Sequence, residues 1–182
     1  CKDGFINLNS FEGSEDSNKI RIVRAHLEED SGKLVHLGED SSIIDFNRSG
    51  IPLIEVVSAP DISSSNQAKC YLVQLKQIIQ YVGISDCDME KGNFRIDLNV
   101  SVKRKTDKEM GTRREVKNLN SFKAVEKAIE YEFYNQIKII GEGKEIKQST
   151  MTWDEEEGKT VLMRTKEEAQ DYRYFPEPDL PP

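Results

Sequence analysis

The stretch Asn93-Phe-Arg-Ile-Asp-Leu-Asn-Val-Ser-Val102 decides the fold class, because apolar and polar residues alternate along it without a break. Its apolar side consists of Phe94, Ile96, Leu98, Val100 and Val102. Its polar side consists of Arg95, Asp97, Asn99 and Ser101. A period of two indicates a strand that packs one face on a core and turns the other toward water or a ligand. We therefore predict a sheet with one open, polar face.

Shorter strand patterns lie on both sides of this stretch, separated by turn residues such as Asn47-Arg-Ser-Gly50. The further predicted strands are Gly4–Leu8, Ile20–Leu27, Lys33–His36, Ser42–Phe46, Pro52–Val57, Thr112–Asn118, Glu145–Trp153 and Thr160–Arg164. The last two are expected to form a closing hairpin around the acidic turn Asp154–Gly158.

Two helices interrupt the strands. Ser64 and Gln67 are placed as a capping box for the first, and Gly83 is placed to end it. Its apolar stripe is Ala68, Leu72, Leu75, Ile79 and Val82. The second is expected from about Phe122 to Ile140, ended by Gly141, with Phe122, Val125, Ile129, Phe133, Ile137 and Ile140 on its buried side. Mostly antiparallel strands with two inserted helices predict an α+β fold.

Composition narrows the classes of function. The 182 residues contain 33 acids and 26 bases, for a net charge of -7, which argues against coating nucleic acid by bulk charge. A locally basic cleft for one RNA end stays compatible with that balance. The three cysteines are widely spaced and suggest neither a disulfide framework nor a zinc site, so a reducing compartment is expected. No apolar stretch reaches membrane-spanning length, and no signal peptide is recognised.

Glu55 lies within the apolar run Ile51–Val57, which reads as a buried strand. A carboxylate there needs a cation or several donors, because removing its water costs several kcal/mol or more. A second acidic cluster, His26-Leu-Glu-Glu-Asp30, follows another strand. Carboxylate oxygens near strand ends suit a hard cation such as Mg²⁺. The alternative is a structural ion pair of Glu55 with an arginine or lysine.

The polar side of the Asn93–Val102 stretch is the second candidate site. Its cation, carboxylate and amide are short-reach groups of the kind that hold phosphate and magnesium. The next strand contributes Arg113, Arg114, Glu115 and Lys117, which extend this surface or form a charge ladder in solvent. Neither G-x-x-x-x-G-K-[ST] nor G-x-G-x-x-G occurs, and neither histidine is paired with a nucleophile in a known signature.

Several segments, in this order, resemble the B subunit of the tRNA-dependent amidotransferases, the GatB/GatE family. The matching segments are Arg24–Lys33, Asp45–Val57 with Pro60-Asp-Ile62, Val116–Phe122 and Asp171-Tyr-Arg-Tyr-Phe-Pro-Glu-Pro-Asp179. Together they cover nearly the whole chain from about Ile20. Ordered agreement of this kind is more specific than any single motif.

The resemblance implies a cradle domain with a fold like that of the glutamine synthetase and guanido kinase catalytic domains. It also implies a two-step reaction. ATP and Mg²⁺ serve to phosphorylate the side-chain carboxylate of a misacylated glutamyl- or aspartyl-tRNA, and ammonia then displaces the phosphate. The ammonia comes from glutamine at a separate amidase subunit, and a third, small subunit completes the complex. A cytoplasmic location is implied, bacterial or in the organellar counterpart, with no membrane partner.

Carried over by position, Glu29 and Glu55 match magnesium ligands, with Glu28 beside them. Arg95 and Asp97 match a catalytic polar pair, and Asn99 and Lys117 are assigned to nucleotide binding. The sequence departs from the family at two places. The usual Cys-Asp-Ala-Asn reads Ile96-Asp-Leu-Asn99, and the paired arginines often found before the tryptophan are missing from Gln148–Trp153.

By this resemblance residues 1–182 are one incomplete catalytic domain, without the family's N-terminal metal-ligand segment and its C-terminal tRNA-binding helical domains. We expect this piece to be inactive alone and to bind tRNA weakly, and amide formation by it with an amidase subunit would contradict this. Two alternatives stay open. One is a non-catalytic module of an RNA-associated complex with structural ion pairs. The other is the related archaeal subunit specific for glutamyl-tRNA(Gln), whose extra inserted domain has no counterpart here.

Overall fold

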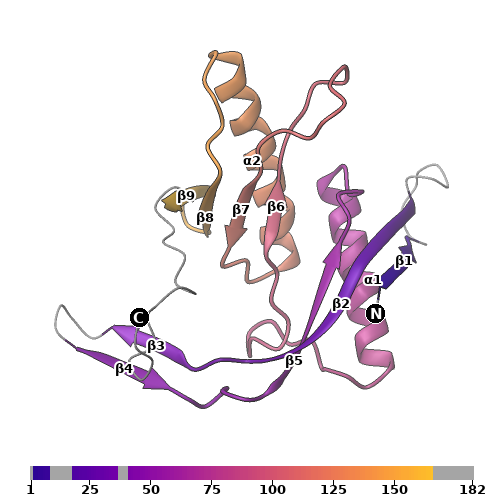
Figure 1. The fold of residues 1–182 in the computed structure, drawn as a ribbon, viewed down its shortest axis with the longest axis vertical. Coiled ribbons are helices and arrows are strands. Elements are labelled where there is room, and N and C mark those ends of the chain that lie inside the picture. The colour runs from indigo at the N-terminus through magenta and orange to yellow at the C-terminus, as the bar shows by residue number, and fades with distance from the viewer. Residues whose placement is uncertain (1, 9–17, 37–40, 166–182) are drawn as a thin grey trace, which may run out of the picture. The chain divides into compact units, whose positions relative to one another are not determined.

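The computed structural model describes residues 2–8, 18–36 and 41–165, and its architecture is α+β, as predicted (Figure 1). The chain divides into two compact units, Cys1–Ser63 and Ser64–Pro182. Each unit has its own sheet and its own buried side chains. One catalytic domain over the whole chain stays a prediction.

The first unit is built from antiparallel strands. Its main sheet has the order β1-β2-β5, formed by β1 (Lys2–Asn7), β2 (Lys19–Glu29) and β5 (Pro52–Ser58). A separate two-stranded ribbon pairs β3 (Lys33–His36) with β4 (Ser42–Asp45). Ile6, Leu8 and Ile20 are buried and form the core of the main sheet, whereas Leu34, Ile43, Ile44 and Phe46 are exposed on and beside the ribbon.

Asp61 links the segment after β5 to the start of β2 through hydrogen bonds with Arg21. Its carboxylate accepts hydrogen bonds from the backbone N–H, the Nε and the Nη2 of Arg21, at 2.9, 2.9 and 2.6 Å. The backbone N–H of Ala59 donates to the carbonyl of Arg21 at 2.9 Å beside this pair. The side-chain hydrogen bond from Arg21 holds the pKa of Asp61 below its ordinary value, against the opposing effect of partial burial.

This contact predicts an acid-sensitive contribution to stability. Because the pKa of Asp61 is lowered on folding, its stabilising effect is present above the unfolded pKa of about 3.9 and is lost as pH falls through the folded pKa. We expect Asp61→Asn to unfold at lower urea concentration than wild type at pH 7, with the difference disappearing toward pH 2. Urea unfolding by circular dichroism at several pH values measures this, with Glu29→Gln as a control. A difference that is constant over pH would contradict it.

The second unit is a four-stranded mixed sheet with two helices. It contains α1 (Ser65–Tyr81), β6 (Leu98–Val100), β7 (Arg114–Lys117), α2 (Phe122–Gly141), β8 (Ser149–Asp154) and β9 (Lys159–Thr165). The strand order is β6-β7-β8-β9. The β7–β8 pair is parallel and connected through α2, and the other two pairs are antiparallel. This arrangement leaves α2 against one face of the sheet, where it contacts β6 and β9.

Small residues bring α2 close to the sheet. Ala124, Val125 and Ala128 are buried on the helix, and Val116 and Met151 are buried beneath them on β7 and β8. Both helices begin where the sequence analysis places them. The predicted cap of α1 forms, because the Ser64 side chain accepts from the Gln67 N–H at 3.1 Å; in α2 the Ser121 side chain, which was not predicted as a cap, accepts from the Ala124 N–H at 3.0 Å. Each such cap satisfies one of the backbone donors left open at a helix start.

The predicted buried side of α2 is wrong in its C-terminal half. Phe133, Ile137 and Ile140 are 45, 46 and 36% exposed, whereas Glu132 and Gln136 are fully buried. Glu132 accepts hydrogen bonds from the Thr160 hydroxyl and from Gln136 Nε2, and its Oε2 lies 3.6 Å from Arg114 Nη1. The carboxylate is tolerated there because a cation and two donors replace its water.

Several boundaries of the elements also differ from the predictions. The alternating stretch forms strand pairs only at Leu98–Val100, because β7 supplies paired backbone for those residues alone. Gly141 is the last helical residue of α2, and the turn after it uses the left-handed conformation at Gly143, with φ of 73°. The strand expected to begin at Glu145 begins at Ser149. Gly83 does follow α1 with a φ of 71°, as predicted.

Neither described helix combines the length and the apolar composition needed to cross a membrane.

Candidate active site

The face of the second unit's sheet opposite α2 is polar. The strand register places Asn99, Glu115 and Thr150 side by side on β6, β7 and β8. Lys117 and Thr152 form the next row of the same face. Side chains alternate between the two faces of a strand, so Val116 and Met151, between these residues, point to the core under α2.

Lys117 is the centre of this polar face. Its Nζ lies 2.9 Å from Asp97 Oδ2 and 3.5 Å from Glu115 Oε1. The other oxygen of Glu115 accepts a hydrogen bond from the Thr150 hydroxyl at 3.0 Å. Partial burial acts to lower the pKa of Lys117, but the hydrogen bond and charge of Asp97 and the charge of Glu115 outweigh it and raise that pKa. Lys117 is therefore a fixed cation between two carboxylates at neutral pH.

Two threonines of this face were not identified from the sequence. Thr150 donates to Glu115, and the hydroxyl of Thr152 accepts from Asn118 Nδ2 at 2.8 Å. Asn118 reaches Thr152 from a left-handed backbone conformation, with φ of 61°, directly after β7. The sequence did contain a signal for them. Thr150 and Thr152 alternate with Met151 and Trp153, and such alternation predicts that both threonines lie on one face of a strand.

The structure brings together most of the predicted polar set but separates its arginines. Asp97, Asn99, Glu115 and Lys117 share the open face, and Arg95 is exposed just before β6. Arg114 lies on the opposite face, where it contacts Glu132 in the core. Within β7, the extension of the open face therefore comes from Glu115 and Lys117.

The environment of Glu55 differs from the buried strand that the sequence indicated. Its side chain is 44% exposed, and its Oε2 accepts from Arg24 Nη2 at 2.9 Å. Neighbouring Ile54 is 42% exposed. The arginine contact meets the condition for a structural ion pair. An exposed pair of this kind contributes only about 0–1 kcal/mol, so it does not lock Glu55.

The register of β2 and β5 separates the three carboxylates assigned to magnesium. His26 is directly opposite Glu55 in the β2–β5 pair. Arg24, His26, Glu28 and Glu55 therefore lie on one face of these two strands. Glu29 is opposite Pro52 and lies on the other face. Glu28 is also near His26, at 3.9 Å between Oε1 and Nε2. Glu28 is thus the partner that the strand geometry offers to Glu55.

Over residues 2–8, 18–36 and 41–165, no three histidine, cysteine, aspartate or glutamate side chains are grouped closely enough to hold a metal ion by themselves. Magnesium often uses only one or two protein carboxylates and completes its octahedral shell with water and substrate phosphates. Glu28 and Glu55 supply that kind of donor. All three magnesium assignments stay predictions. The strand register favours Glu28 and Glu55, which share a face, over Glu29, which lies on the other face.

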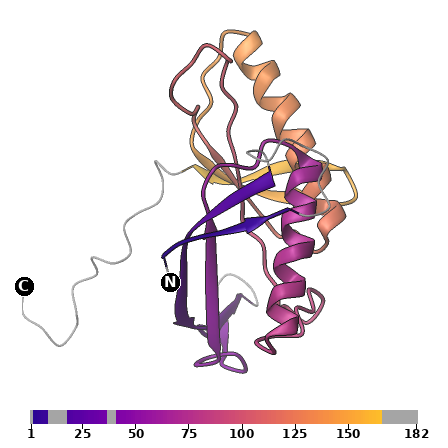
Figure 2. The ribbon, with the colours of Figure 1, turned by 90° about the vertical axis from the view of Figure 1, so that its right-hand side faces the viewer.

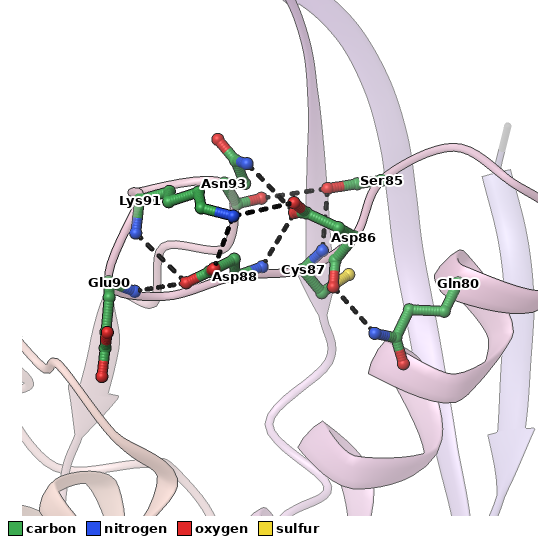
Figure 3. Close-up of polar contacts among 8 residues, drawn as sticks. All are labelled: Gln80, Ser85, Asp86, Cys87, Asp88, Glu90, Lys91 and Asn93. Atoms are coloured by element: carbon green, nitrogen blue, oxygen red, sulfur yellow. Dashed lines mark hydrogen bonds and ion pairs between the residues drawn. The ribbon is translucent and has the colours of Figure 1, made fainter.

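A further acidic segment, Ser85–Asn93, forms a turn that is held by hydrogen bonds among its own residues (Figure 3). The Oδ1 of Asp86 accepts from Asn93 Nδ2 and from the backbone N–H of Asp88, both at 3.0 Å. Asp88 in turn accepts from the backbone N–H groups of Glu90 and Lys91 at 2.9 and 3.2 Å. These backbone hydrogen bonds keep the pKa values of both aspartates below their ordinary range. Their oxygens hold a turn, and we do not assign them to the site.

The aromatic segment Asp171–Asp179, which carries part of the resemblance, lies outside the described residues.

Comparison with known proteins agrees with this resemblance. The family model described as the GatB/GatE catalytic domain matches residues 1–182. A protein of Caldanaerobacter subterraneus, named as the B subunit of an aspartyl/glutamyl-tRNA(Asn/Gln) amidotransferase, is 54% identical over 182 residues, all of this chain and 38% of that protein. One of the same name from Carboxydothermus hydrogenoformans is 55% identical, again over all of this chain and 38% of its own length. The chain thus spans under two fifths of these relatives, and it belongs to the GatB/GatE catalytic-domain family.

Proposed function

We propose that this chain is the catalytic part of a tRNA-dependent amidotransferase that acts on glutamyl-tRNA(Gln) or aspartyl-tRNA(Asn). The observation that carries the proposal is Lys117, fixed as a cation between Asp97 and Glu115 on an open sheet face. Membership of the family supports it, and so do relatives named as amidotransferase subunits. A fold of the glutamine synthetase and guanido kinase type is part of the proposal.

The chemistry requires activation of a carboxylate, which is a poor acyl donor. Transfer of a phosphoryl group from ATP, assisted by Mg²⁺, converts one carboxylate oxygen into a good leaving group. Such a transfer needs positioning and charge neutralisation more than a protein nucleophile. In our assignment, Lys117 neutralises charge on phosphate oxygens, Asp97 orients Lys117, and the exposed amide of Asn99 donates to the nucleotide.

Glu28 and Glu55 provide the hard oxygen donors that Mg²⁺ prefers, on one face of the β2–β5 strand pair. Binding there requires Arg24 to release Glu55, which costs little because both side chains are about half exposed, at 48 and 44%. The released guanidinium then becomes a donor for a phosphate or carboxylate. Arg95, exposed before β6, is assigned the same kind of contact with substrate.

The remaining partners follow from the same proposal. Misacylated tRNA is the substrate, an amidase subunit supplies ammonia, and a third, small subunit completes a cytoplasmic heterotrimer. One observation favours a different function, a non-catalytic binding module: the Arg24–Glu55 hydrogen bond at 2.9 Å is the structural pair that such a module would contain.

A matched pair of variants tests the assignment of Glu55. In the full-length protein with its partner subunits, we expect Glu55→Gln to weaken Mg²⁺-dependent ATP hydrolysis and amide formation roughly 10- to 100-fold, as is usual when a site's metal affinity is reduced. Raising the Mg²⁺ concentration should partly restore the rate. Glu29→Gln removes the same charge from the opposite face of β2 and should leave the rate within about threefold of wild type.

If both variants keep wild-type rates at limiting Mg²⁺ while circular dichroism shows them folded, Glu55 belongs to a structural ion pair. That result would support the alternative function, a non-catalytic binding module. Equal losses of rate in Glu29→Gln and Glu55→Gln would contradict the proposal that only the face of β2 that carries Glu28 contributes to magnesium binding.

A further inference from the structure

The loop that joins β6 to β7 carries a positive charge that the rest of the chain does not. Residues 103–113 contain five basic residues and two acidic ones, in a chain whose net charge is -7. The five cations are Lys103, Arg104, Lys105, Lys108 and Arg113, and all are exposed. A local basic patch in an acidic protein indicates a specific anionic partner rather than general attraction to polyanions.

These cations lack the ion pairs that several other cations of this unit make. Within the described part of the chain, none of the five forms an ion pair, whereas Lys69, Lys127 and Lys159 lie within 3.1 Å of a glutamate oxygen. Asp107, one of the two acidic residues of the loop, already accepts hydrogen bonds from within the loop. Asp107 accepts from the backbone N–H of Arg104 at 3.1 Å and from the Thr106 hydroxyl at 3.4 Å, which closes the turn.

The loop lies beside the C-terminal end of α2, as Figures 1 and 2 both show. It borders a shallow hollow that is lined by Val102, Met110 and Ile140 together with Lys103, Arg104 and Lys108. Met110 is 51% and Ile140 is 36% exposed. The loop also leads directly into β7, which carries Glu115 and Lys117 of the candidate active site.

We propose that the 103–113 loop binds the sugar–phosphate backbone of the tRNA substrate. The inference rests on the proposed function and adds to it a surface that holds the RNA next to the sheet face. Exposed cations without ion pairs suit phosphate oxygens, because each contact releases condensed counterions from the RNA. A protein partner fits less well, since lysine is depleted in protein–protein interfaces and the loop is rich in it.

The test is tRNA binding by the full-length protein in its complex, measured at several salt concentrations. We choose Lys105→Gln/Lys108→Gln, because neither side chain makes a described hydrogen bond or ion pair and folding should not change. We expect a Kd for tRNA roughly tenfold higher near physiological salt, and a slope of log Kd against log salt that is smaller by about two. The loss should be similar for acylated and uncharged tRNA, because both forms carry the same phosphates. It should also be similar for tRNAs of different sequence, because phosphate contacts carry no sequence information.

The control is Lys123→Gln/Lys127→Gln, which removes two lysines from the first turns of α2, roughly 20–25 Å along the helix from Ile140. Its Kd and salt slope should match wild type. If both double variants bind tRNA as wild type does, the loop proposal is overturned. If the loop variant instead loses a partner protein from the complex and keeps tRNA affinity, the loop is a protein interface and the proposal is equally overturned.

The same experiment separates this inference from the function on which it rests. Wild-type complex that forms glutaminyl- or asparaginyl-tRNA, together with a loop variant of unchanged affinity, refutes the loop contact alone. Wild-type complex that forms no amide product refutes the proposed function, whatever the salt dependence of its binding.

Discussion

Asp97→Asn is expected to lower kcat for amide formation by about 10²–10³-fold, the usual cost of removing one preorganised electrostatic group from an active site. The substitution keeps the size of the side chain but removes the charge that holds Lys117 Nζ at 2.9 Å. Lys117 is then expected to move toward Glu115, its remaining partner at 3.5 Å, and away from the position that the proposed phosphoryl transfer requires. The measurement is single-turnover amide formation on glutamyl-tRNA(Gln) by the full-length complex.

The affinity for tRNA should stay within about twofold of wild type, because an interaction made chiefly in the transition state affects kcat rather than binding. Glu156→Gln is the control, since Glu156 is an exposed carboxylate on the β8–β9 turn of the same sheet. A well-folded Asp97→Asn protein with kcat within about threefold of wild type would show that the polar face is structural and that the reaction occurs elsewhere.

Glu132→Ala is expected to destabilise the second unit by about 3–5 kcal/mol, because it leaves one partner of a buried ion pair uncompensated. Arg114, whose side chain is 14% exposed, would lose its only described carboxylate contact. Its Nε and the Oε1 of Gln136 have no hydrogen-bond partner among the described residues even in wild type, so little is available to replace Glu132. Urea unfolding followed by fluorescence measures this, since Trp153 is the only tryptophan and is buried in this unit.

Two further variants separate charge from packing. Glu130→Ala, on the exposed side of α2, removes only a hydrogen bond from the Ser65 hydroxyl and should cost about 1 kcal/mol or less. Replacing both buried partners, as Arg114→Met/Glu132→Leu, should recover most of the stability lost in Glu132→Ala, because apolar side chains of similar volume often substitute for a buried ion pair. A double variant less stable than Glu132→Ala would mean that the pair specifies the packing of α2 on the sheet.

The sequence predicted the elements of this fold well where the signal is local. A capping serine, a helix-ending glycine and runs of alternation depend on neighbouring residues, and Ser64 and Gly83 both lie where their roles require. The polar face was also predictable, since Asp97 and Asn99 are exposed between half-buried neighbours as the alternation indicates.

Features that depend on distant partners were not predictable in this way. The burial of Glu132 depends on Arg114 and Thr160, residues on other elements that no helical periodicity reveals. The length of β6 depends on how much of β7 is available to pair with it. The separation of Glu28 from Glu29 relative to Glu55 depends on strand register, and a change of one residue would exchange their faces.

The parallel pairing of β7 with β8 has a consequence for the order in which the parts of the polar face form during synthesis of the chain. Residues 118–148 separate the two strands, and Glu115 meets Thr150 only when α2 has packed and brought β8 alongside. Such non-local pairing forms late, because a long connection must be closed first. A nascent chain therefore exposes Asp97 and Lys117 to solvent well before it holds them in place, and the polar face becomes functional only once the ribosome has released β8.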